Sequence, residues 1–490
     1  MKVAVLGAGL GGLSAAAHLA SYGYDVTIFE KESSPGGRAR RTSIEVGSES
    51  FNLDCGPTVF TMLDIARIPF EALGENMNDW VEMKNVNPSY RGVFADGTEL
   101  NWPSANEKLD QVISDFAGID EVIGFKKYEK WLNRLYEVEY EPFIAKNYNS
   151  VIDLLKQAKP LSMLFFMGAF RKMDKKTKAY LSDERLQLML TFQSLYAGVT
   201  PDQALAIYSI ISYMDLIKGV YYPEGGMCVY PERLADACKS AGVKIEYNSE
   251  ISKVIKQNSK CEIQTNGTAE IFDAVISNAD LPYSYPEIFD LEMPKSVSKG
   301  KYSPSCLLYV VGGTFEKKSE LAHHNIYFSK NSQKSFDELI KEQTLMSDPS
   351  ILISNPTYTD KTIAPANKDI FYVLEPSPNL NSNDHFSDSE EIKQRMKSHL
   401  KKAGIGVTQL DCEVLLTPNE WEKQGFYKGT PFSLAHTFLQ SGPFRPKNEV
   451  KQIPGLFLCG TGTTPGVGIP MVIESGRLAA EKARAYLENN

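Results

Sequence analysis

Four glycines near the N-terminus are spaced as in a loop that binds a dinucleotide. Gly7, Gly9, Gly11 and Gly12 stand in the sequence G-A-G-L-G-G, which satisfies the pattern G-x-G-x-x-G. In such a loop the first glycine permits a sharp turn, the second lets a pyrophosphate approach the backbone, and the third lets a helix pack closely on a strand. The N–H groups at the start of that helix attract phosphate. The glycines therefore predict a pyrophosphate site.

An acidic residue follows where a nucleotide fold binds ribose. We expect a buried strand over residues 3–6, a helix over 10–21 and a second strand over 25–29, which Glu30 ends. A carboxylate there accepts hydrogen bonds from a ribose diol and repels a 2′-phosphate, which favours FAD or NAD over NADP. A glycine-rich turn without a ligand is one alternative. A secretory signal is another, but the glycines interrupt its apolar core and the βαβ pattern continues past it.

A second loop can contact the same pyrophosphate. Gly37 and Arg38 lie in the turn-rich segment 32–40, where a cation suits a phosphate, although a surface loop with solvated arginines is the alternative. The sequence G-G-R just beyond the ribose-binding acid resembles FAD oxidoreductases whose nucleotide domains are of the amine-oxidase and glutathione-reductase type. FAD is therefore the expected cofactor.

The C-terminal part of the chain supplies another helix start. A buried strand over 455–459 runs into Gly460, Thr461 and Gly462, and a helix is expected from about 471 to 487. The N–H groups at its start form a second anion- or dipole-binding position. We expect this segment to contact the flavin end of the cofactor.

Composition and missing motifs exclude several other functions. The net charge of −9 disfavours nucleic acid as a partner. The seven cysteines are scattered and form no C-x-x-C, and the six histidines have no metal-ligand spacing, so no metal is expected. No uncharged apolar stretch approaches the ~20 residues that span a bilayer. A peripheral protein in a reducing cytoplasm fits these features.

Several further segments together resemble the carotenoid desaturases of the bacterial phytoene desaturase type, FAD-dependent enzymes that include hydroxycarotenoid 3,4-desaturases. The specific matches are L-D-C-G-P-T-V-F-T-M over 53–62 and P-G-V-G-I-P over 465–470. The weaker matches occur in the same order over nearly the whole chain: 219–226, 275–280, 302–306, 432–436 and 444–446.

The resemblance implies an α/β fold of the monoamine oxidase kind in three parts. An FAD-binding Rossmann-like domain would comprise 1–75, 215–284 and 416–490, and a mixed-sheet substrate domain 76–105 and 285–415. A helical, membrane-facing part would comprise 106–214, in which helices are expected over 127–138 and 183–195.

The resemblance also assigns residue roles. Glu30 would bind the adenosine ribose, Arg38 the pyrophosphate and Ile251 the adenine region through its backbone. The ribityl chain and isoalloxazine would contact a C-terminal set: Gly460, Thr461, Ile469, Pro470 and Met471. Thr464 and Met471 depart from the family pattern, which has histidine and a small residue there in many members.

The chemistry expected is double-bond formation in a long linear isoprenoid. The reacting carbons of such a substrate carry no acidic C–H bond, so hydride loss to flavin N5 precedes proton loss, and no indispensable charged acid–base pair is expected. A quinone or oxygen would reoxidise the flavin. The catalytic side chain is not identified by any motif. Asp280 is either an acid near the flavin or a helix N-cap, and His323 and His324 fit an ordinary loop or strand pair better than a catalytic base.

An insoluble substrate implies access from lipid. The apolar segment 161–170 precedes the cationic segment 171–178, and together they suit an anionic membrane surface, although a core helix with a solvated basic end is the alternative. Two other functions remain open on the same fold. One is an FAD amine oxidase, and the other is a carrier of prenyl lipids without redox activity.

Overall fold

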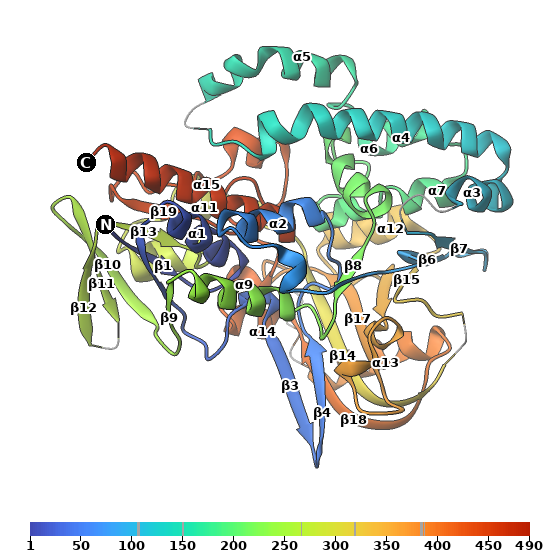
Figure 1. Cartoon of the computed structure of the whole chain (residues 1–490). Helices are drawn as coiled ribbons and strands as arrows, with labels where there is room; N and C mark the ends of the chain where they lie inside the picture. The colour runs from blue at the N-terminus through green and yellow to red at the C-terminus, as the bar shows by residue number, and fades with distance from the viewer. Residues whose placement is uncertain (105–107, 149–150, 266, 318–319, 383–385, 387) are drawn as a thin grey trace.

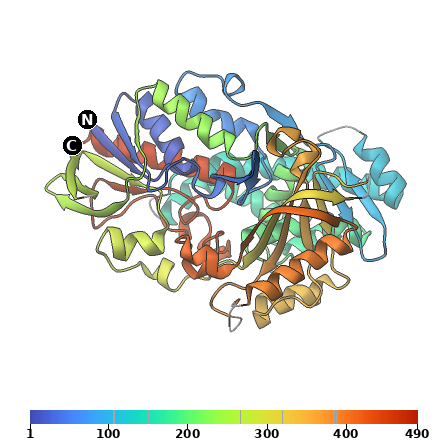
Figure 2. The ribbon, with the colours of Figure 1, turned by 90° about the horizontal axis from the view of Figure 1, so that it is seen from below.

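The computed structural model describes residues 1–104, 108–148, 151–265, 267–317, 320–382, 386 and 388–490. The two termini lie close together, and the N-terminus leads directly into β1, the central strand of a parallel sheet (Figures 1 and 2). The predicted domain boundary at 105 and 106 lies outside the described residues. The other predicted boundaries stay predictions.

The nucleotide-type sheet has five parallel strands. Their order is β19 (Leu456–Leu458), β13 (Ala274–Ser277), β1 (Lys2–Leu6), β2 (Asp25–Phe29) and β9 (Lys244–Glu246). The four strands other than the edge strand β9 are mainly apolar and buried, because both faces of the sheet are covered there. Alternate residues of β1 enter opposite cores, with Val3 and Val5 on one face and Ala4 and Leu6 on the other.

Helices cover one face of this sheet and a small antiparallel sheet lies near the other. Three helices pack together over the first face: α1 (Leu10–Ser21), α9 (Val229–Ser240) and α15 (Ile469–Glu488). The second face adjoins the meander of β10 (Ile251–Gln257), β11 (Lys260–Thr265) and β12 (Thr268–Phe272). Segments from both ends and the middle of the chain thus build one unit.

A mixed seven-stranded sheet forms the second part of the molecule. Its order is β18 (Gly406–Leu416), β14 (Ser305–Glu316), β17 (Asp369–Ser377), β16 (Ile351–Ser354), β15 (His324–Tyr327), β6 (Tyr90–Val93) and β7 (Glu99–Trp102). Only the β15–β6 pair is parallel among these described strands. Helix α13 (Ser389–Lys402) lies along this sheet (Figure 2).

Two strand pairs and several short helices complete these two units. The pairs are β3 (Arg41–Val46) with β4 (Glu49–Asp54) and β5 (Met83–Asn85) with β8 (Tyr221–Pro223). The helices are α2 (Leu63–Ala72), α10 (Leu281–Tyr283), α11 (Lys295–Ser298), α12 (Ser332–Asp337) and α14 (Pro418–Lys423). The β3–β4 hairpin projects at the bottom of Figure 1.

A helical layer lies at the opposite side, at the top of Figure 1. Its helices are α3 (Leu109–Ala117), α4 (Ile119–Glu139), α5 (Ala158–Phe166), α6 (Met173–Lys178), α7 (Glu184–Met189) and α8 (Ile210–Ser212). The expected helix 127–138 lies within α4. The expected helix 183–195 is wrong in extent, because α7 ends at Met189 and a 3₁₀ turn over Phe192–Ala197 follows. Among the described residues, no helix is long and apolar enough to cross a membrane.

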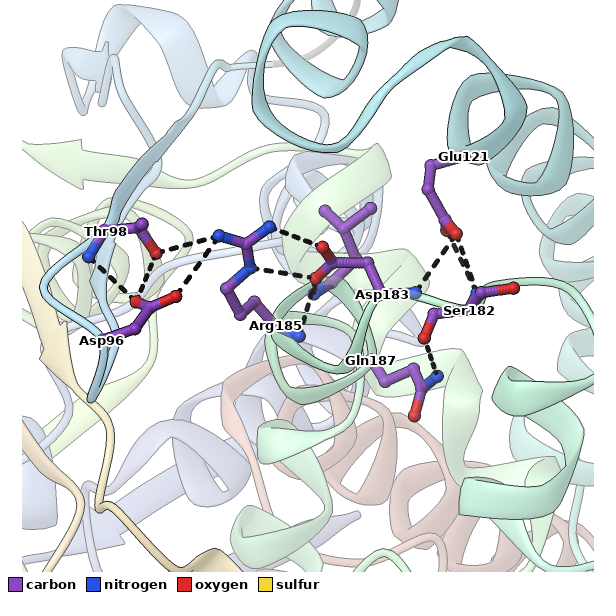
Figure 3. A network of polar contacts seen from close by, with 8 residues as sticks. Asp96, Thr98, Glu121, Ser182, Asp183, Arg185 and Gln187 are labelled. Atoms are coloured by element: carbon purple, nitrogen blue, oxygen red, sulfur yellow. Dashed lines mark hydrogen bonds and ion pairs between the residues drawn. The ribbon is translucent and has the colours of Figure 1, made fainter.

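A polar network ties this layer to the seven-stranded sheet (Figure 3). Arg185 of α7 donates to both carboxylate oxygens of Asp183, and its Nη1 lies 3.4 Å from Asp96 Oδ2 in the β6–β7 turn. Glu121 of α4 accepts from the backbone N–H of Ser182 at 2.9 Å, just before α7. The start of α7 is therefore fixed to both neighbours, which holds the helical layer over the sheet.

Candidate functional site

The glycine loop and the second loop meet backbone to backbone. Gly9 pairs with Gly36, and the Gly36 N–H donates to the Ala8 carbonyl at 2.9 Å. A Cβ atom on Gly37 would lie 3.3 Å from Gly9 Cα, and one on Gly12 would lie 2.0 Å from the Gly7 carbonyl oxygen. Side chains would separate the two loops and push α1 away from β1. No side chain caps the start of α1, so its first N–H groups remain available to a ligand.

Glu30 and Arg38 lie on either side of these loops. The buried Glu30 carboxylate accepts from the backbone N–H of Ala8 at 2.6 Å and of Glu32 at 3.0 Å, which fixes its position and leaves lone pairs for hydroxyl donors. Arg38 stacks over the Phe426 ring at 4.4 Å. Its Nε and Nη2 atoms are buried and lack a hydrogen-bond partner among the described residues. Buried donors of this kind require an acceptor, and an anionic ligand supplies one.

Asp280 faces the same region without capping its helix. It stands at the N-cap position of α10, but its carboxylate accepts from the Tyr427 N–H at 3.3 Å instead of capping the helix. Burial raises the pKa of Asp280, and the nearby Arg38 opposes this shift. Asp280 is thus a cavity-lining acid at the N-cap position, and of the two predicted alternatives the side-chain cap is not formed.

The C-terminal segment reaches the loops from the other side. The Gly460 N–H donates to Ser475 Oγ at 3.0 Å, and the Thr461 carbonyl accepts from Arg445 at 2.6 Å. Helix α15 begins at Ile469, earlier than the expected residue 471, because Pro470 suits the first turn of a helix. No side chain caps α15 either, so its first N–H groups are also available.

These features surround one end of a cavity of about 1150 Å³. The predicted residues that line it are Gly7, Gly9, Glu30, Gly37, Arg38, Ile251, Gly460, Thr461, Ile469, Pro470 and Met471. Gly11 and Gly12 do not line it. A Cβ on Gly11 would lie 2.7 Å from Asn278 Oδ1, so both of these glycines permit close packing behind the cavity.

The remainder of the cavity is enclosed mostly by apolar side chains. They come from the helical layer and from the seven-stranded sheet, and they include Phe143, Leu164, Leu188, Phe192, Ile326 and Leu352. The volume exceeds the 300–1,000 Å³ typical of a site for one drug-sized ligand. The space therefore suits a cofactor at the polar end and a long apolar molecule beyond it.

Two acids interrupt this apolar wall, and sequence reasoning found neither. Asp215 is buried and accepts from the Tyr90 hydroxyl at 3.1 Å, and burial raises its pKa to about 7. Glu139 is buried at the end of α4, and burial raises its pKa well above the ordinary value. The only signal in the sequence is a single acid inside an apolar run, as in I-I-S-Y-M-D-L-I over 210–217.

The stretch 53–62 contains one residue that holds a loop in place and others that line the cavity. Asp54 accepts from the Tyr222 hydroxyl at 2.6 Å and from the Met227 N–H at 3.0 Å, which fastens the segment around Gly225 to β4. Thr58, further along, lines the cavity. Asp54 does not, so its role is to hold the loop.

Other predicted candidates lie away from the cavity. His323 and His324 stack at 4.3 Å at the start of β15, and burial lowers the pKa of both, so they are neutral. Neither lines the cavity. His385 lies outside the described residues. Among the described residues, no group of histidine, cysteine and acidic side chains is arranged to hold a metal ion.

Comparison with known proteins identifies the class. The chain belongs to the family of flavin-containing amine oxidoreductases, whose family model matches residues 10–483. It is a flavin-dependent oxidoreductase, and its cofactor is FAD. The unpaired Arg38 donors, the Glu30 carboxylate and the glycine backbones fit the pyrophosphate and ribose of this cofactor.

Named relatives cover the whole chain. It is 40% identical over 489 residues to the phytoene dehydrogenase of Streptomyces griseus, covering 98% of this chain and 94% of the relative. It is 30% identical over 500 residues to the 4,4′-diapophytoene desaturase of Staphylococcus aureus strain Newman, covering 98% of each. An oxidoreductase structure from Methanosarcina mazei shares the fold, with a TM-score of 0.63 and 17% identity over 98% of this chain and 100% of that one.

Proposed function

We propose that this protein is an FAD-dependent carotenoid desaturase that introduces double bonds into a long linear isoprenoid. The observation that carries the proposal is the continuous cavity, which joins the glycine loops at one end to a mostly apolar space between the helical layer and the mixed sheet. The named relatives, at 40% and 30% identity over the whole chain, support this substrate class.

We assign FAD-binding roles to the residues that line the polar end of the cavity. Glu30 would hold the adenosine ribose, Arg38 the pyrophosphate and Ile251 the adenine region. The flavin ring and ribityl chain would lie against Gly460, Thr461 and the residues that begin α15. Bound FAD supplies the hydride acceptor, with quinone or oxygen as its proposed reoxidant. The apolar walls hold the substrate extended and exclude water, so that the reacting bond is oriented before the chemistry begins.

The test is desaturation by the purified holoprotein in liposomes. Phytoene, diapophytoene and a 1-hydroxycarotenoid are supplied in turn, and absorption spectra are recorded, because each added conjugated double bond moves the absorption to longer wavelength. We expect a red-shifted product from at least one of them. Peroxide formation from an amine, with no change in any polyene spectrum, would instead indicate an amine oxidase. Polyene binding without any spectral change by flavin-loaded protein would indicate a carrier.

We also propose that the helical layer rests on the inner face of a membrane. Three segments each contribute a cavity-lining and an exposed apolar residue. They are the 3₁₀ turn Val151–Gln157 with Leu154 and Leu155, α5 with Leu164 and Phe166, and the turn Phe438–Gln440 with Phe438 and Leu439. Leu155, Phe166 and Leu439 are 71%, 86% and 70% exposed. An apolar surface at the rim of a lipid-binding cavity suits entry of an insoluble substrate.

The cationic segment 171–178 contributes less charge to this surface than its composition suggests. Lys176 donates to the Met167 carbonyl at 2.8 Å and lies 4.7 Å from the centre of the Trp131 ring. Lys172 donates to the Gln203 carbonyl at 2.7 Å. Lys172 is nevertheless exposed, as are Arg171, Lys175 and Lys178, and these four cations can meet anionic headgroups.

Flotation with anionic liposomes tests the membrane proposal. The triple variant Leu155→Ser, Phe166→Ser, Leu439→Ser should lose most of its association. A control variant replaces exposed apolar residues of the distant sheets, Ile255, Ile271 and Val407, by serine and should float like the wild type. Equal flotation of both variants would refute the assignment of this surface.

A further inference from the structure

The Glu139 carboxyl is an unpaired acid in the apolar part of the cavity. It ends α4, just before the π-helical turn Tyr140–Ile144, and it is 7% exposed. Its Oε2 atom is buried without a hydrogen-bond partner, and no ion pair to Glu139 is found among the described residues. Buried polar atoms of native proteins are rarely unpaired, because the free energy lost from hydration is not recovered. This acid therefore requires a partner that the folded chain does not supply.

Its surroundings keep the acid in its neutral form. Burial alone raises the pKa of Glu139 well above the ordinary value. Of the titratable side chains nearby, Tyr208 and His436 are neutral, and the Arg445 cation beside them donates its hydrogen bonds to backbone carbonyls. Burial, and secondarily Glu139 itself, raises the pKa of Tyr208 to about 12, while burial lowers the pKa of His436. A neutral carboxylic acid carries one O–H donor and free acceptor positions, so it pairs best with an uncharged group that both accepts and donates.

Tyr208 connects Glu139 to the loop before α15, which the proposed function places beside the flavin. Glu139 acts electrostatically on the Tyr208 hydroxyl, so the two groups are neighbours. The Tyr208 ring packs against that of His436 at 6.2 Å, and a Cβ on Gly466 would lie 2.1 Å from a carbon of the His436 ring. Gly466 belongs to the loop that leads into α15. The Tyr208 hydroxyl is already paired with Ser441 Oγ at 2.7 Å, so it does not serve Glu139.

We propose that Glu139 is a specificity determinant that hydrogen-bonds a hydroxyl group carried by the isoprenoid substrate near its reacting end. The inference rests on the proposed desaturase function and narrows its substrate class to hydroxylated linear carotenoids. A pure hydrocarbon leaves the acid unpaired. An alcohol can accept a hydrogen bond from the carboxylic O–H group and donate one to a carboxyl oxygen. Sites built around a buried polar group discriminate against analogues that lack the matching group.

The test compares two substrates that differ by one hydroxyl. A linear carotene and its 1-hydroxy derivative are supplied to holoprotein in liposomes, and kcat/KM is measured for each. The wild type should favour the hydroxylated substrate by about tenfold or more, since one hydrogen bond is worth roughly that factor. Glu139→Met should abolish the preference through slower turnover of the hydroxylated substrate only. Glu139→Gln, which keeps a donor and an acceptor, should retain most of it.

Controls separate this role from a structural or catalytic one. Glu121→Met alters another buried acid of α4, whose carboxylate is paired to the Ser182 N–H away from the cavity, and it should leave the substrate preference unchanged. Glu139→Met should not lower the melting temperature, because it removes an unpaired group. An unchanged hydroxyl preference in Glu139→Met would overturn the proposal. So would an equal loss of turnover on both substrates.

A second readout keeps the inference separate from the proposed function. Quenching of tryptophan fluorescence by each polyene measures binding without turnover. If the wild type desaturated neither substrate, the proposed function would fail. The role of Glu139 would still be supported if the wild type bound the hydroxylated polyene more tightly and the Glu139→Met variant bound both polyenes equally. Equal binding of both polyenes by the wild type would refute it.

Discussion

A Cβ atom on Gly476 would lie 2.2 Å from the carbonyl oxygen of Gly11. Helices α1 and α15, from opposite ends of the chain, therefore touch backbone to backbone. This contact aligns the starts of both helices on the cavity, since Gly9 precedes α1 and Gly468 precedes α15. Both ends of the proposed FAD site depend on one close helix crossing.

Gly476→Ala should separate these helices and weaken both folding and cofactor binding. Overpacking a tight contact costs about 1–3 kcal/mol, so we expect a loss of this size in urea unfolding of the FAD-free protein, together with weaker binding of FAD. Gly406→Ala is the matched control, because a Cβ there would approach nothing closer than 3.6 Å. Equal free energies of unfolding for the two variants would show that α1 and α15 can move apart without loss of stability.

Arg38→Met should weaken FAD binding without weakening the apoprotein. The Arg38 Nε and Nη2 atoms are buried without hydrogen-bond partners among the described residues, so removing them breaks no hydrogen bond of the FAD-free fold. The lost charge-assisted hydrogen bonds should reduce the affinity for FAD by about 10–100-fold, measured by titration of the apoprotein with FAD.

A neighbouring arginine provides the opposite control. Arg41 donates to both carboxylate oxygens of Glu232 at 2.8 Å. Arg41→Met should lower stability by up to ~1 kcal/mol and leave the affinity for FAD unchanged, because this pair ties β3 to α9 away from the cavity. If Arg38→Met destabilised the apoprotein and bound FAD normally, its proposed contact with the pyrophosphate would be wrong.

Glu30→Gln tests the ribose contact. Both carboxylate oxygens accept backbone N–H bonds, and an amide keeps only one acceptor, so its NH₂ group would face an N–H donor. We expect at least tenfold weaker retention of FAD, measured by the flavin absorbance left after gel filtration. Glu246→Gln, at the exposed end of the adjacent strand β9, should retain the flavin fully. A fully yellow Glu30→Gln protein would contradict the assignment.

Local patterns were enough to predict the strands, loop and helices around the proposed nucleotide site. The strand–loop–helix–strand sequence up to Glu30 is contiguous, so the glycine spacing and the apolar runs fix its geometry. The same is true of the strand and helix around Gly460. The helix expected over 183–195 failed for a local reason. The side chains of Thr191 and Gln193 donate hydrogen bonds to the backbone carbonyls of Gln187 and Met189. Such bonds between side chain and backbone favour turns over a continuous helix.

The apolar half of the cavity could not be predicted, because tertiary packing alone assembles it. Glu139, Asp215 and Tyr196 come from separate segments and follow no spacing rule, yet all three line the same space. The resemblance to carotenoid desaturases predicted an insoluble isoprenoid substrate but not which polar groups interrupt the cavity that would hold it. A single acid within an apolar run is a weak signal, since burial of that acid depends on partners far away in the sequence.

Asp215→Asn should change how stability depends on pH. Burial raises the pKa of Asp215 to about 7, from an ordinary value near 3.8. Between these values the folded protein holds a proton that the unfolded chain releases, so this acid makes stability fall as pH rises from about 4 to about 7. Above about pH 7, the loss of stability caused by the buried Asp215 no longer changes with pH. The Tyr90 hydroxyl can donate to the asparagine oxygen as it does to the carboxylate.

We therefore expect the variant to gain stability relative to the wild type as pH rises, by about 2–4 kcal/mol in total between pH 4 and pH 8. Urea unfolding at intervals of one pH unit measures the difference. Any unpaired amide N–H in the variant adds an offset that does not vary with pH. Asp290→Asn, at a side chain 85% exposed, is the control and should show no such trend. A flat difference for Asp215→Asn would mean that the acid stays ionised in the folded protein.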